Sequence, residues 1–446
     1  MMKLKTFPGG VHPHDHKEYS KNAPIEKMDL PLKVVIPLSQ HIGAPSKPVV
    51  KVGEQVKTGQ IIAEPGGFVS ITQHASITGK VTKIAEFPHP CGTTSMAIEI
   101  TGDGQTDEWI ELTNEEDVMS VSVDVMKDRI KIAGVCGMGG AGFPTHVKLS
   151  PPADKSIDTV ILNGVECEPY LTADYRLMLE RADDIVTGLQ LVMKIVGAKR
   201  GMIGIEANKP DAIKVMQKAV SQLKDISVVG LKVRYPQGGE KQLIYAATKR
   251  SVPNKGGLPM DIGVVVQNVG TAVAVYEAVR YSKACIERII TISGKIVTNP
   301  KNLQARIGTS FQALFDKCGG AKEEIAKVIS GGPMMGFAIP DLTAPMAKGS
   351  SGLLFLNKKE AKMDIEYTCL HCGRCVDVCP HNLIPSMISN GAMNEDWDMA
   401  EKAGAMDCMK CGTCAYVCPA QIKMVQWIDI AKINVGKIIR ERQQKS

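Results

Sequence analysis

The sequence has few aromatic residues, almost no excess of charge and no long apolar run. Phe, Trp and Tyr make up 4% of the 446 residues, and 53 Lys and Arg stand against 47 Asp and Glu. Nucleic-acid-binding proteins usually show a basic face or aromatic stacking platforms, so this composition argues against nucleic acid as a partner. No stretch of about 18 apolar residues occurs, which argues against a membrane-spanning helix.

No signal peptide is expected either, because the first ten residues have no apolar core. The chain nevertheless contains 13 cysteines. Thiols without a secretion signal are expected in a reducing compartment, so we expect a cytoplasmic location. The length and the 44% hydrophobic content are sufficient for about three folded domains.

Two runs of four cysteines occupy the last fifth of the chain. Both read C-x2-C-x2-C-x3-C-P, and the second repeats the first at a fixed offset of 39, from position 369 to position 408. This spacing holds 4Fe-4S clusters in bacterial two-cluster ferredoxins. Zinc sites and disulfides are the alternatives, but two complete runs exceed what a four-ligand zinc ion needs. The runs are Cys369, Cys372, Cys375 and Cys379, followed by Cys408, Cys411, Cys414 and Cys418.

A crossed set of ligands is expected for the two clusters. Three thiolates from one tight loop can bind three irons of a cube, and the fourth iron faces away from that loop. By the crossing rule, Cys418 completes the first cluster and Cys379 completes the second. Residues 382–407 are predicted to be helical, which resembles the helical kind of two-cluster ferredoxin. Their expected apolar stripe is Met387, Ile388, Met393 and Trp397.

The N-terminal residues 1–30 are polar and rich in turns. They include His12, His14 and His16, whose spacing is compatible with a metal site. No clustered partners or second shell are visible nearby, so we favour a solvated arm.

Residues 31–101 predict a small β sandwich, because short β segments alternate with glycines. Segments 49–60 and 74–81 resemble the two halves of a biotinyl or lipoyl domain. Where such a domain presents its modified lysine, this chain has Ala-Glu-Pro-Gly-Gly-Phe at 63–68. The resemblance therefore implies a structural or docking module without a swinging arm. The predicted strands are 33–38, 49–52, 60–63, 68–72, 79–84 and 96–100.

Beyond a charged connector at 107–117, strand and helix patterns alternate. This alternation predicts a parallel sheet covered by helices on both faces, and such sheets bind ligands at the carboxyl ends of their strands. The predicted strands are 158–162, 201–206 and 227–234, and the predicted helices are 182–196 and 211–223.

Residues 134–148 form a glycine-rich loop that ends at Lys148. Glycines allow backbone amides to approach an anion or a flat ring closely, and the lysine adds a positive charge. For the glycines alone, a tight turn between elements is the preferred interpretation. The segment is not the ordinary dinucleotide fingerprint, because no clear strand precedes it.

Four segments in order, however, resemble the NADH-oxidising subunit of respiratory complex I. They read GMGGAGFPT at 137–145, NGVECEP at 163–169, YPQGGE at 235–240 and QNVGT at 267–271. The sequence departs from that family at Val165, Lys241 and Gln267, where the family has Asp, Glu and Asn. The resemblance implies that FMN is bound by Gly137, Gly139, Gly140, Ala141, Gly142, Lys148, Asn163, Glu166, Asn268 and Thr271. It further implies that Phe143 and Glu168 contact NADH, and that Tyr235, Gly239 and Glu240 line the cofactor site.

The domain order is similar to that of the RnfC component of the Rnf complex. Residues 286–358 resemble the β-grasp domain that follows the flavin domain in complex I, with strands at 289–293 and 327–330 and a helix at 310–318. The opening FPGGVHP at 7–13 matches the Rnf family. The expected fold is multidomain α/β and α+β. Its parts are a 1–30 arm, a 31–101 barrel sandwich, a 115–285 FMN and NADH domain, a 286–358 β-grasp domain, a 363–425 two-cluster ferredoxin domain and a 426–446 basic helix.

The resemblance implies a peripheral protein on the cytoplasmic face of the cell membrane. It would pass electrons between NADH, FMN and two 4Fe-4S clusters, and membrane partners and a ferredoxin-interacting subunit would couple this transfer to ferredoxin and ion translocation. Hydride transfer to a flavin requires no acid or base, so no catalytic side chain is predicted. The helix at 421–440 is basic and amphipathic, and we favour packing on its own domain over lipid contact.

Two other functions remain open. One is a soluble flavoprotein reductase similar to the cobalamin reductase of metabolic microcompartments. The other is a non-catalytic subunit that only wires electrons between partners.

Overall fold

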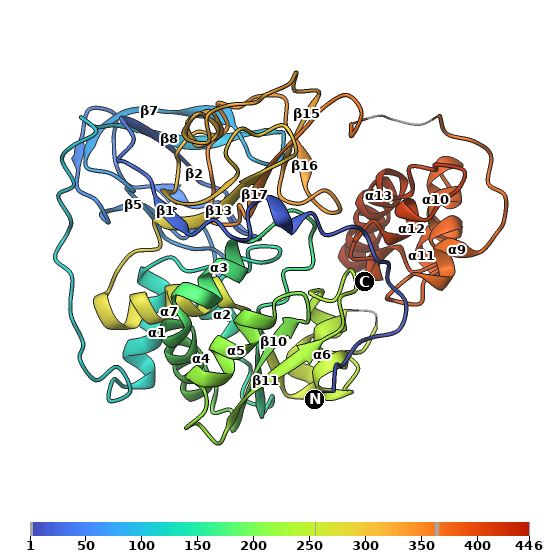
Figure 1. Ribbon diagram of the computed structural model, residues 1–446, viewed down its shortest axis with the longest axis horizontal. Coiled ribbons are helices and arrows are strands. Elements are labelled where there is room, and N and C mark those ends of the chain that lie inside the picture. Colours follow the sequence, from blue (N-terminus) through green and yellow to red (C-terminus); the bar gives the residue numbers. More distant parts are fainter. Residues whose placement is uncertain (1–2, 255, 362–364, 446) are drawn as a thin grey trace.

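The computed structural model describes residues 3–254, 256–361 and 365–445. In Figure 1 a β sandwich (blue) and a second β domain (orange) lie together above an α/β domain (green), and a helical domain (red) stands to one side. The N-terminal arm (dark blue) runs past the helical domain toward the second β domain. The predicted fold class, multidomain α/β and α+β, is confirmed.

The β sandwich has two small sheets, with strand orders β2-β8-β7-β4 and β3-β5-β6. Its interior is aliphatic because alternate residues of a strand face the same side. Ile36, Ile62 and Ile98 are no more than 1% exposed. The strands are β2 (Lys33–Pro37), β3 (Lys47–Pro48), β4 (Gln55–Val56), β5 (Ile61–Glu64), β6 (Gln73–His74), β7 (Gly79–Pro88) and β8 (Thr94–Thr101).

Two predicted strands of this sandwich, at 49–52 and 68–72, are wrong. In the first segment a turn overrides the β-branched residues: the Glu54 amide donates to the Lys51 carbonyl at 3.1 Å, and Val52 is 61% exposed. The second segment is a loop that is buried from Ser70 to Thr72, whereas Phe68 is 83% exposed. Its Ser70 hydroxyl donates to the Ala44 carbonyl at 2.8 Å, so side-chain bonds replace a strand ladder.

The α/β domain contains a parallel sheet of order β11-β10-β9-β12. Val160 and Leu162 face one apolar core, whereas Ile161 between them faces another. Helices therefore cover both faces, as the alternating pattern predicts. The strands are β9 (Thr159–Asn163), β10 (Arg200–Glu206), β11 (Ile226–Leu231) and β12 (Val264–Asn268). The helices are α1 (Val123–Ile132), α2 (Thr145–Lys148), α3 (Ala173–Glu180), α4 (Ala182–Val196), α5 (Pro210–Ala219), α6 (Glu240–Thr248), η2 (Pro259–Ile262) and α7 (Val269–Tyr281).

One helix and one strand of this domain end earlier than predicted. The helix predicted to reach 223 ends at Ala219, since Met216 is its last buried apolar residue and a turn follows. The strand predicted to reach 234 ends at Leu231, where the chain pairs instead with the N-terminal arm through a bridge to Lys5.

The arm is only partly solvated, so that prediction is wrong for its anchored residues. Phe7 and Lys17 are only 2% and 4% exposed. The 3₁₀ turn η1 (Lys17–Tyr19) lies against the α/β domain, and β1 (Ile25–Lys27) pairs in parallel with β14 of the next domain. The arm thus connects parts that are far apart in sequence.

The second β domain has the strand order β1-β14-β13-β17-β15-β16 with one helix, α8. Its Phe355 packs in the same apolar core as Ile36 and Ile98 of the sandwich. The two β domains therefore share one interior, although the α/β domain separates them in sequence. The elements are β13 (Glu287–Ser293), β14 (Lys301–Arg306), α8 (Phe311–Lys317), β15 (Lys327–Ser330), β16 (Phe337–Ala338) and β17 (Gly352–Leu356).

The helical domain repeats itself with the offset of the cysteine runs. α9 and α12 begin at 374 and 413, and α10 and α13 begin at 385 and 424. Positive φ angles recur at the same offset, at His371 and Lys410 and at Asn382 and Gln421. The elements are α9 (Arg374–Asp377), α10 (Pro385–Met393), α11 (Trp397–Lys402), η3 (Ala405–Asp407), α12 (Thr413–Tyr416) and α13 (Met424–Lys445).

The predicted helical stretch at 382–407 is broken, and its apolar stripe is partly wrong. A turn separates α10 from α11, and Met387 and Met393 are 44% and 38% exposed. Ile388 is fully buried as expected. The buried face of α10 instead includes Gly391, where an added Cβ would lie 3.3 Å from the Cβ of Ala400. A small residue is needed because the two helices cross closely.

The last helix belongs to the helical domain. α13 begins at Met424, so the predicted boundary between 425 and 426 falls within its first turn and does not separate two parts. Met424, Ile428, Ala431 and Val435 are buried against the domain, as expected for packing on its own domain, whereas Ile433 is 53% exposed. Among the described residues, no helix combines the length and apolarity that crossing a membrane would require.

Substitution of Gly10 tests the packing of the arm, because at this residue the arm passes between the α/β domain and the helical domain. Its amide donates to the Val378 carbonyl of the helical domain at 2.8 Å, and an added Cβ would lie 2.5 Å from the Tyr235 carbonyl oxygen. We expect Gly10→Ala to lower the free energy of unfolding by about 1–3 kcal/mol beyond the cost of its positive φ. Denaturant unfolding of the cluster-loaded protein measures this.

Gly197→Ala is the matched control. Gly197 also has a positive φ, +71° against +80°, but an added Cβ there meets nothing within 4 Å. It should cost only the backbone strain, about 1–2 kcal/mol. Equal losses in the two variants would contradict a steric role for Gly10.

Candidate cofactor sites

The cysteines of the helical domain gather into two sets, each drawn from both runs. Cys369, Cys372, Cys375 and Cys418 line one cavity of about 130 Å³. We call this the outer set. It takes three thiols from the first run and the last thiol from the second, which is the crossed arrangement expected from the spacing.

The remaining cysteines form the inner set, Cys408, Cys411, Cys414 and Cys379. Burial raises the pKa of Cys414 to about 12, and the thiols of Cys411, Cys408 and Cys379 are close enough to affect it. Four thiolates in one buried place repel one another unless cations compensate their charge. The donor set therefore fits an iron-sulfur cluster, whose irons keep thiolates deprotonated.

Backbone amides point at several of these sulfurs. The amides of His371 and Lys410 each lie 3.4 Å from the Sγ two residues earlier, in Cys369 and Cys408. The Leu383 amide lies 3.3 Å from the Sγ of Cys379. Such N–H···S bonds stabilise thiolate charge and adjust the reduction potential of a cluster.

The two sets differ in their position. The inner set faces the α/β domain: the Tyr235 hydroxyl donates to the Cys411 carbonyl at 2.8 Å, and the Gln242 amide donates to the Pro380 carbonyl at 3.1 Å. The outer set lies on the other side, and its Cys372 is exposed. One set is thus next to the α/β domain and the other next to solvent.

The glycine-rich loop lies between α1 and α2, beside the amino end of α7. Its ends are closed by a bond from the Gly137 amide to the Phe143 carbonyl at 2.9 Å. The Met138 amide donates to the Thr271 hydroxyl at 3.0 Å. An added Cβ at Gly139 would lie 2.9 Å from the Asn268 side-chain nitrogen. A larger residue at this position would therefore push the loop away from Asn268.

The centre of this loop fits an anionic, flat cofactor. Gly139, Gly140 and Ala141 are exposed, and within the described ranges their amides make no hydrogen bond. Open donors next to Lys148 suit a phosphate. Lys148 is paired with Glu240 at 2.8 Å, and Phe143 is 37% exposed beside the loop.

Other residues expected at the flavin are used by the fold. Asn163 donates to the Gly238 carbonyl at 2.8 Å and so connects β9 to the loop before α6. The Glu166 carboxylate accepts the Asp174 amide at 2.7 Å at the start of α3. Asn268 accepts the Gly270 amide at 2.7 Å and donates to the Asp174 carboxylate at 2.6 Å.

Glu168 and Tyr235 lie where three domains meet. The Tyr235 hydroxyl lies 3.3 Å from a Glu168 carboxylate oxygen, and the Met334 amide donates to the other at 3.1 Å. Burial raises the pKa of Glu168 to about 7, and it also raises the pKa of Tyr235. An added Cβ at Gly332 would lie 2.3 Å from the Glu168 carboxylate, so Gly332 is needed for this approach. Gly239 immediately precedes α6 and lies next to Met409 of the inner set's loop.

Three charged residues near these sites, of which Lys17 and Arg288 are buried and Asp174 is partly buried, were missed by sequence reasoning. Lys17 donates to the Leu171 carbonyl at 2.5 Å and lies 4.0 Å from the Glu166 carboxylate. Arg288 of β13 donates to the Met138 carbonyl at 2.6 Å and so supports the glycine-rich loop from behind. Burial raises the pKa of Asp174, while Arg288 opposes that shift. No local sequence signal marks them, because their partners are far along the chain.

Family models match four consecutive parts of the chain. They are the RnfC barrel sandwich hybrid domain at 5–105, the Nuo51 FMN-binding domain at 130–277, the SLBB domain at 289–338 and the 4Fe-4S dicluster domain at 368–422. The glycine-rich site and the two cysteine sets lie within the second and fourth of these. Fold and sites together define an iron-sulfur flavoprotein that carries FMN and two 4Fe-4S clusters.

Relatives that match the whole chain have more specific names. The chain is 52% identical over 431 residues to the C component of the proton-translocating ferredoxin:NAD(+) oxidoreductase complex of Clostridium ljungdahlii, covering 96% of this chain and 94% of the relative. It is 46% identical to the Na(+)-translocating counterpart of Acetobacterium woodii, covering 99% of each. The chain belongs to the RnfC family, the C components of the Rnf ion-translocating oxidoreductase complexes.

A solved structure shows the same fold at low sequence identity. An NAD+-reducing [NiFe]-hydrogenase structure is 18% identical with a TM-score of 0.51, covering 68% of this chain and 62% of the other.

Substitution of the fourth cysteines tests the crossed sets. We expect Cys418→Ser to lose the same cluster as Cys372→Ser, and Cys379→Ser the same cluster as Cys411→Ser, because each pair shares one site. EPR of the reduced protein measures which signal remains, and iron analysis should show a loss of about half. Cys91→Ser, outside both runs, should retain both signals. If Cys418→Ser matched Cys411→Ser instead, the crossed sets would be wrong.

Glu168 predicts a pH dependence of stability. Its folded-state pKa of about 7 lies above the ordinary value of 4.5, so the folded chain binds more protons between these values. Stability from this group is therefore lost as pH rises from about 4.5 to about 7, and it changes no further above that window. We expect the unfolding temperature of the wild type to fall by on the order of 2–4 °C more than that of Glu168→Gln across this range. If the unfolding temperature fell equally with pH in the wild type and in Glu168→Gln, the raised pKa of Glu168 would be ruled out.

Proposed function

We propose that this chain is the NADH-reactive subunit of an Rnf-type complex, in which electrons pass between NADH, FMN, the inner cluster and the outer cluster. The relatives' names describe ferredoxin:NAD(+) oxidoreductase complexes that translocate protons or sodium ions. The same coupling, through membrane partners and a ferredoxin-interacting subunit, is proposed here. FMN, when bound, exchanges a hydride's two electrons with NADH and single electrons with clusters.

The spatial order of the sites is the observation that carries this proposal. Tyr235 follows β11 in the α/β domain and touches the inner set directly. The inner set is buried apart from Cys408, which is partly exposed, whereas the outer set includes the exposed Cys372. Electrons from the α/β domain would therefore pass first to a cluster held by the inner set and then to a cluster held by the outer set.

The residues of the flavin site have separable proposed roles. The open amides of 139–141 and the Lys148 ammonium bind the FMN phosphate. Thr271 and Arg288 hold the loop in shape through Met138. Phe143 is exposed at the mouth of the site and contacts NADH, together with Glu168.

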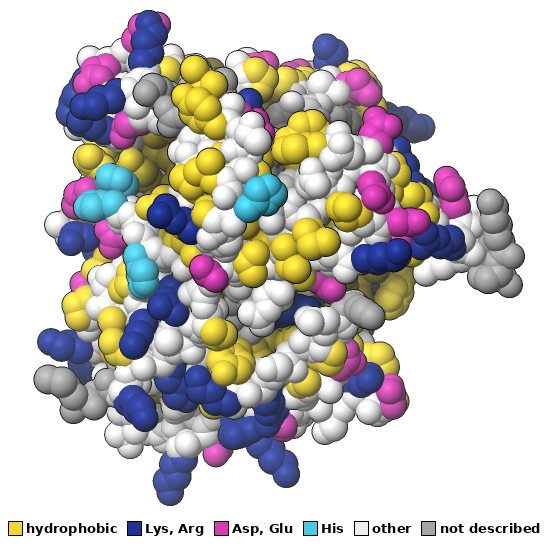
Figure 2. Space-filling view, turned by 90° about the vertical axis from the view of Figure 1, so that its right-hand side faces the viewer, with side chains coloured by type: hydrophobic (Ala, Val, Ile, Leu, Met, Phe, Trp, Pro, Cys, Tyr) yellow, Lys and Arg dark blue, Asp and Glu magenta, His cyan; other side chains and the backbone are white. Residues whose placement is uncertain are grey.

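The outer set also suits exchange with a partner protein. Large apolar side chains around it are exposed: Ile365 by 72%, Tyr367 by 61% and Leu370 by 67%. Figure 2 looks at this side of the molecule and shows hydrophobic side chains spread across it. We place the chain on the cytoplasmic face of the membrane, attached through its partners.

Two observations favour a second candidate, the non-catalytic wiring subunit. Lys148 is engaged by Glu240, and Val165 stands fully buried where the complex I family has an aspartate. In that function the clusters still carry electrons, but NADH does not supply them.

An anaerobic titration with NADH distinguishes the two. In the protein loaded with iron, sulfide and FMN, we expect flavin absorbance to bleach first and reduced-cluster EPR signals to follow. Cys411→Ser should retain flavin reduction but lose reduction of the outer cluster, because the inner cluster lies between them. Cys372→Ser should retain reduction of the inner cluster.

Clusters that dithionite reduces but NADH does not would establish the wiring subunit instead. Reduction of the outer cluster at the wild-type rate in Cys411→Ser would contradict the proposed order.

A further inference from the structure

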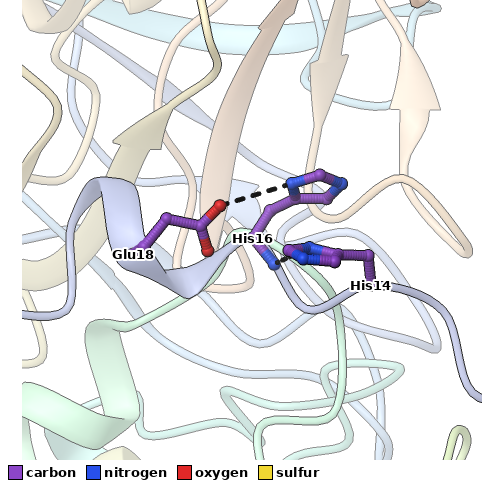
Figure 3. Close-up of side chains that lie close together, drawn as sticks. All are labelled: His14, His16 and Glu18. Atoms are coloured by element: carbon purple, nitrogen blue, oxygen red, sulfur yellow. Dashed lines mark hydrogen bonds and ion pairs between the residues drawn. The ribbon is translucent and has the colours of Figure 1, made fainter.

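Two histidines and a glutamate of the N-terminal arm converge outside the cofactor sites. One ligand atom each from His14, His16 and Glu18 lies within 4.8 Å of the others. Figure 3 shows the two rings one above the other, with the Glu18 carboxylate directed at the ring of His16. We propose that these three side chains form a binding site for a divalent metal ion such as Zn²⁺, Co²⁺ or Ni²⁺.

The backbone of this segment is held in place before any ion binds. His16 has a left-handed conformation, φ 46° and ψ 26°, which non-glycine residues adopt only when their surroundings impose it. The Tyr170 amide donates to the Asp15 carbonyl at 2.8 Å, and the buried Lys17 donates to the Leu171 carbonyl at 2.5 Å. Anchors on both sides of His16 thus fix where its ring lies.

The ring of His16 has an unsatisfied polar atom. Its Nδ1 is buried without a hydrogen-bond partner, and the nearest carboxylate oxygen, of Glu18, is 3.6 Å away. The ring stacks on Tyr170 at 4.5 Å between centroids, and it lies 4.2 Å from the His14 ring, which is tilted by 45°. A buried ring nitrogen without a hydrogen-bond partner, facing a carboxylate, is an arrangement that a bound cation completes.

The ligand types select the class of metal. Imidazole binds Zn²⁺, Co²⁺ and Ni²⁺ well, and a carboxylate is a common third ligand. Zinc requires metal–ligand distances of about 2.0–2.2 Å, so the three atoms must move closer together. His14 and Glu18 are exposed and can rotate, whereas His16 stays in place. Binding through the His14 Nδ1 replaces its long 3.3 Å bond from the His16 amide.

The proposed metal site is close to the place where Glu168 and Tyr235 lie between three domains. The Lys17 ammonium, between His16 and Glu18, also donates to the Glu168 carbonyl at 3.1 Å. A metal that closes this turn fixes Lys17, and with it the backbone of the segment that carries Glu168. The ion is exchangeable, because two of its ligands face solvent and water fills the open positions.

Zinc binding to the cluster-loaded protein tests the site. Isothermal titration with ZnCl₂, followed by gel filtration and metal analysis, should show one zinc per chain. His16→Gln and Glu18→Gln should each weaken binding by about tenfold or more. His12→Gln is the matched control: it lies on the same arm, is exposed, and contacts the Val233 carbonyl at 3.0 Å instead. It should bind zinc as the wild type does.

Two results would overturn the proposal. One is a wild type that retains no zinc while both clusters are present, and the other is unchanged zinc affinity in both His16→Gln and Glu18→Gln. A second measurement guards against misfolding of the variants. Zinc should raise the unfolding temperature of the wild type and of His12→Gln, because it binds only the folded arm, but not that of His16→Gln.

Discussion

The arrangement of this protein depends on one contact, the hydrogen bond from the Tyr235 hydroxyl to the Cys411 carbonyl. It joins the α/β domain to the loop of the inner cysteine set in a place where the tyrosine is 2% exposed. Small residues surround it: Gly10 lies against the Tyr235 carbonyl, and Gly412 lies against the Met334 carbonyl. Since electron transfer needs a short and constant separation between cofactors, backbones that touch without intervening side chains suit this junction.

Buried charge accompanies this close packing. Lys17 of the arm lies 4.0 Å from Glu166 of the α/β domain, and Arg288 of the second β domain donates to the Met138 carbonyl of the glycine-rich loop. Buried ions are tolerated only when they are paired and hydrogen-bonded. Lys209 shows the same requirement, because it donates to the Val165 carbonyl at 2.7 Å and lies 3.6 Å from Glu206. These pairs specify how the domains fit together, and so the domains are not independent units.

Local patterns predicted well wherever local geometry decides the structure. The helix at 182–196 and the strand at 327–330 have the observed boundaries, since each combines a clear apolar period with an end signal such as Gly197. Prediction failed where tertiary contacts replaced the local preference. Val49 and Val52 favour a strand but lie in an exposed turn region, and the polar arm is partly buried because Lys17 finds carbonyl partners about 150 residues away.

The sequence alone determined the chemistry of the cofactor sites, because their ligands are local. The first three cysteines of each run are spaced to bind one cluster from one loop, and glycines allow the amides of a loop to be exposed. Only the tertiary structure decided which cysteine set lies next to the α/β domain, that Glu166 and Asn268 serve helix ends, and that the His16 ring faces Glu18 over Tyr170. These depend on contacts between residues far apart in the chain, and no spacing in the sequence encodes such contacts.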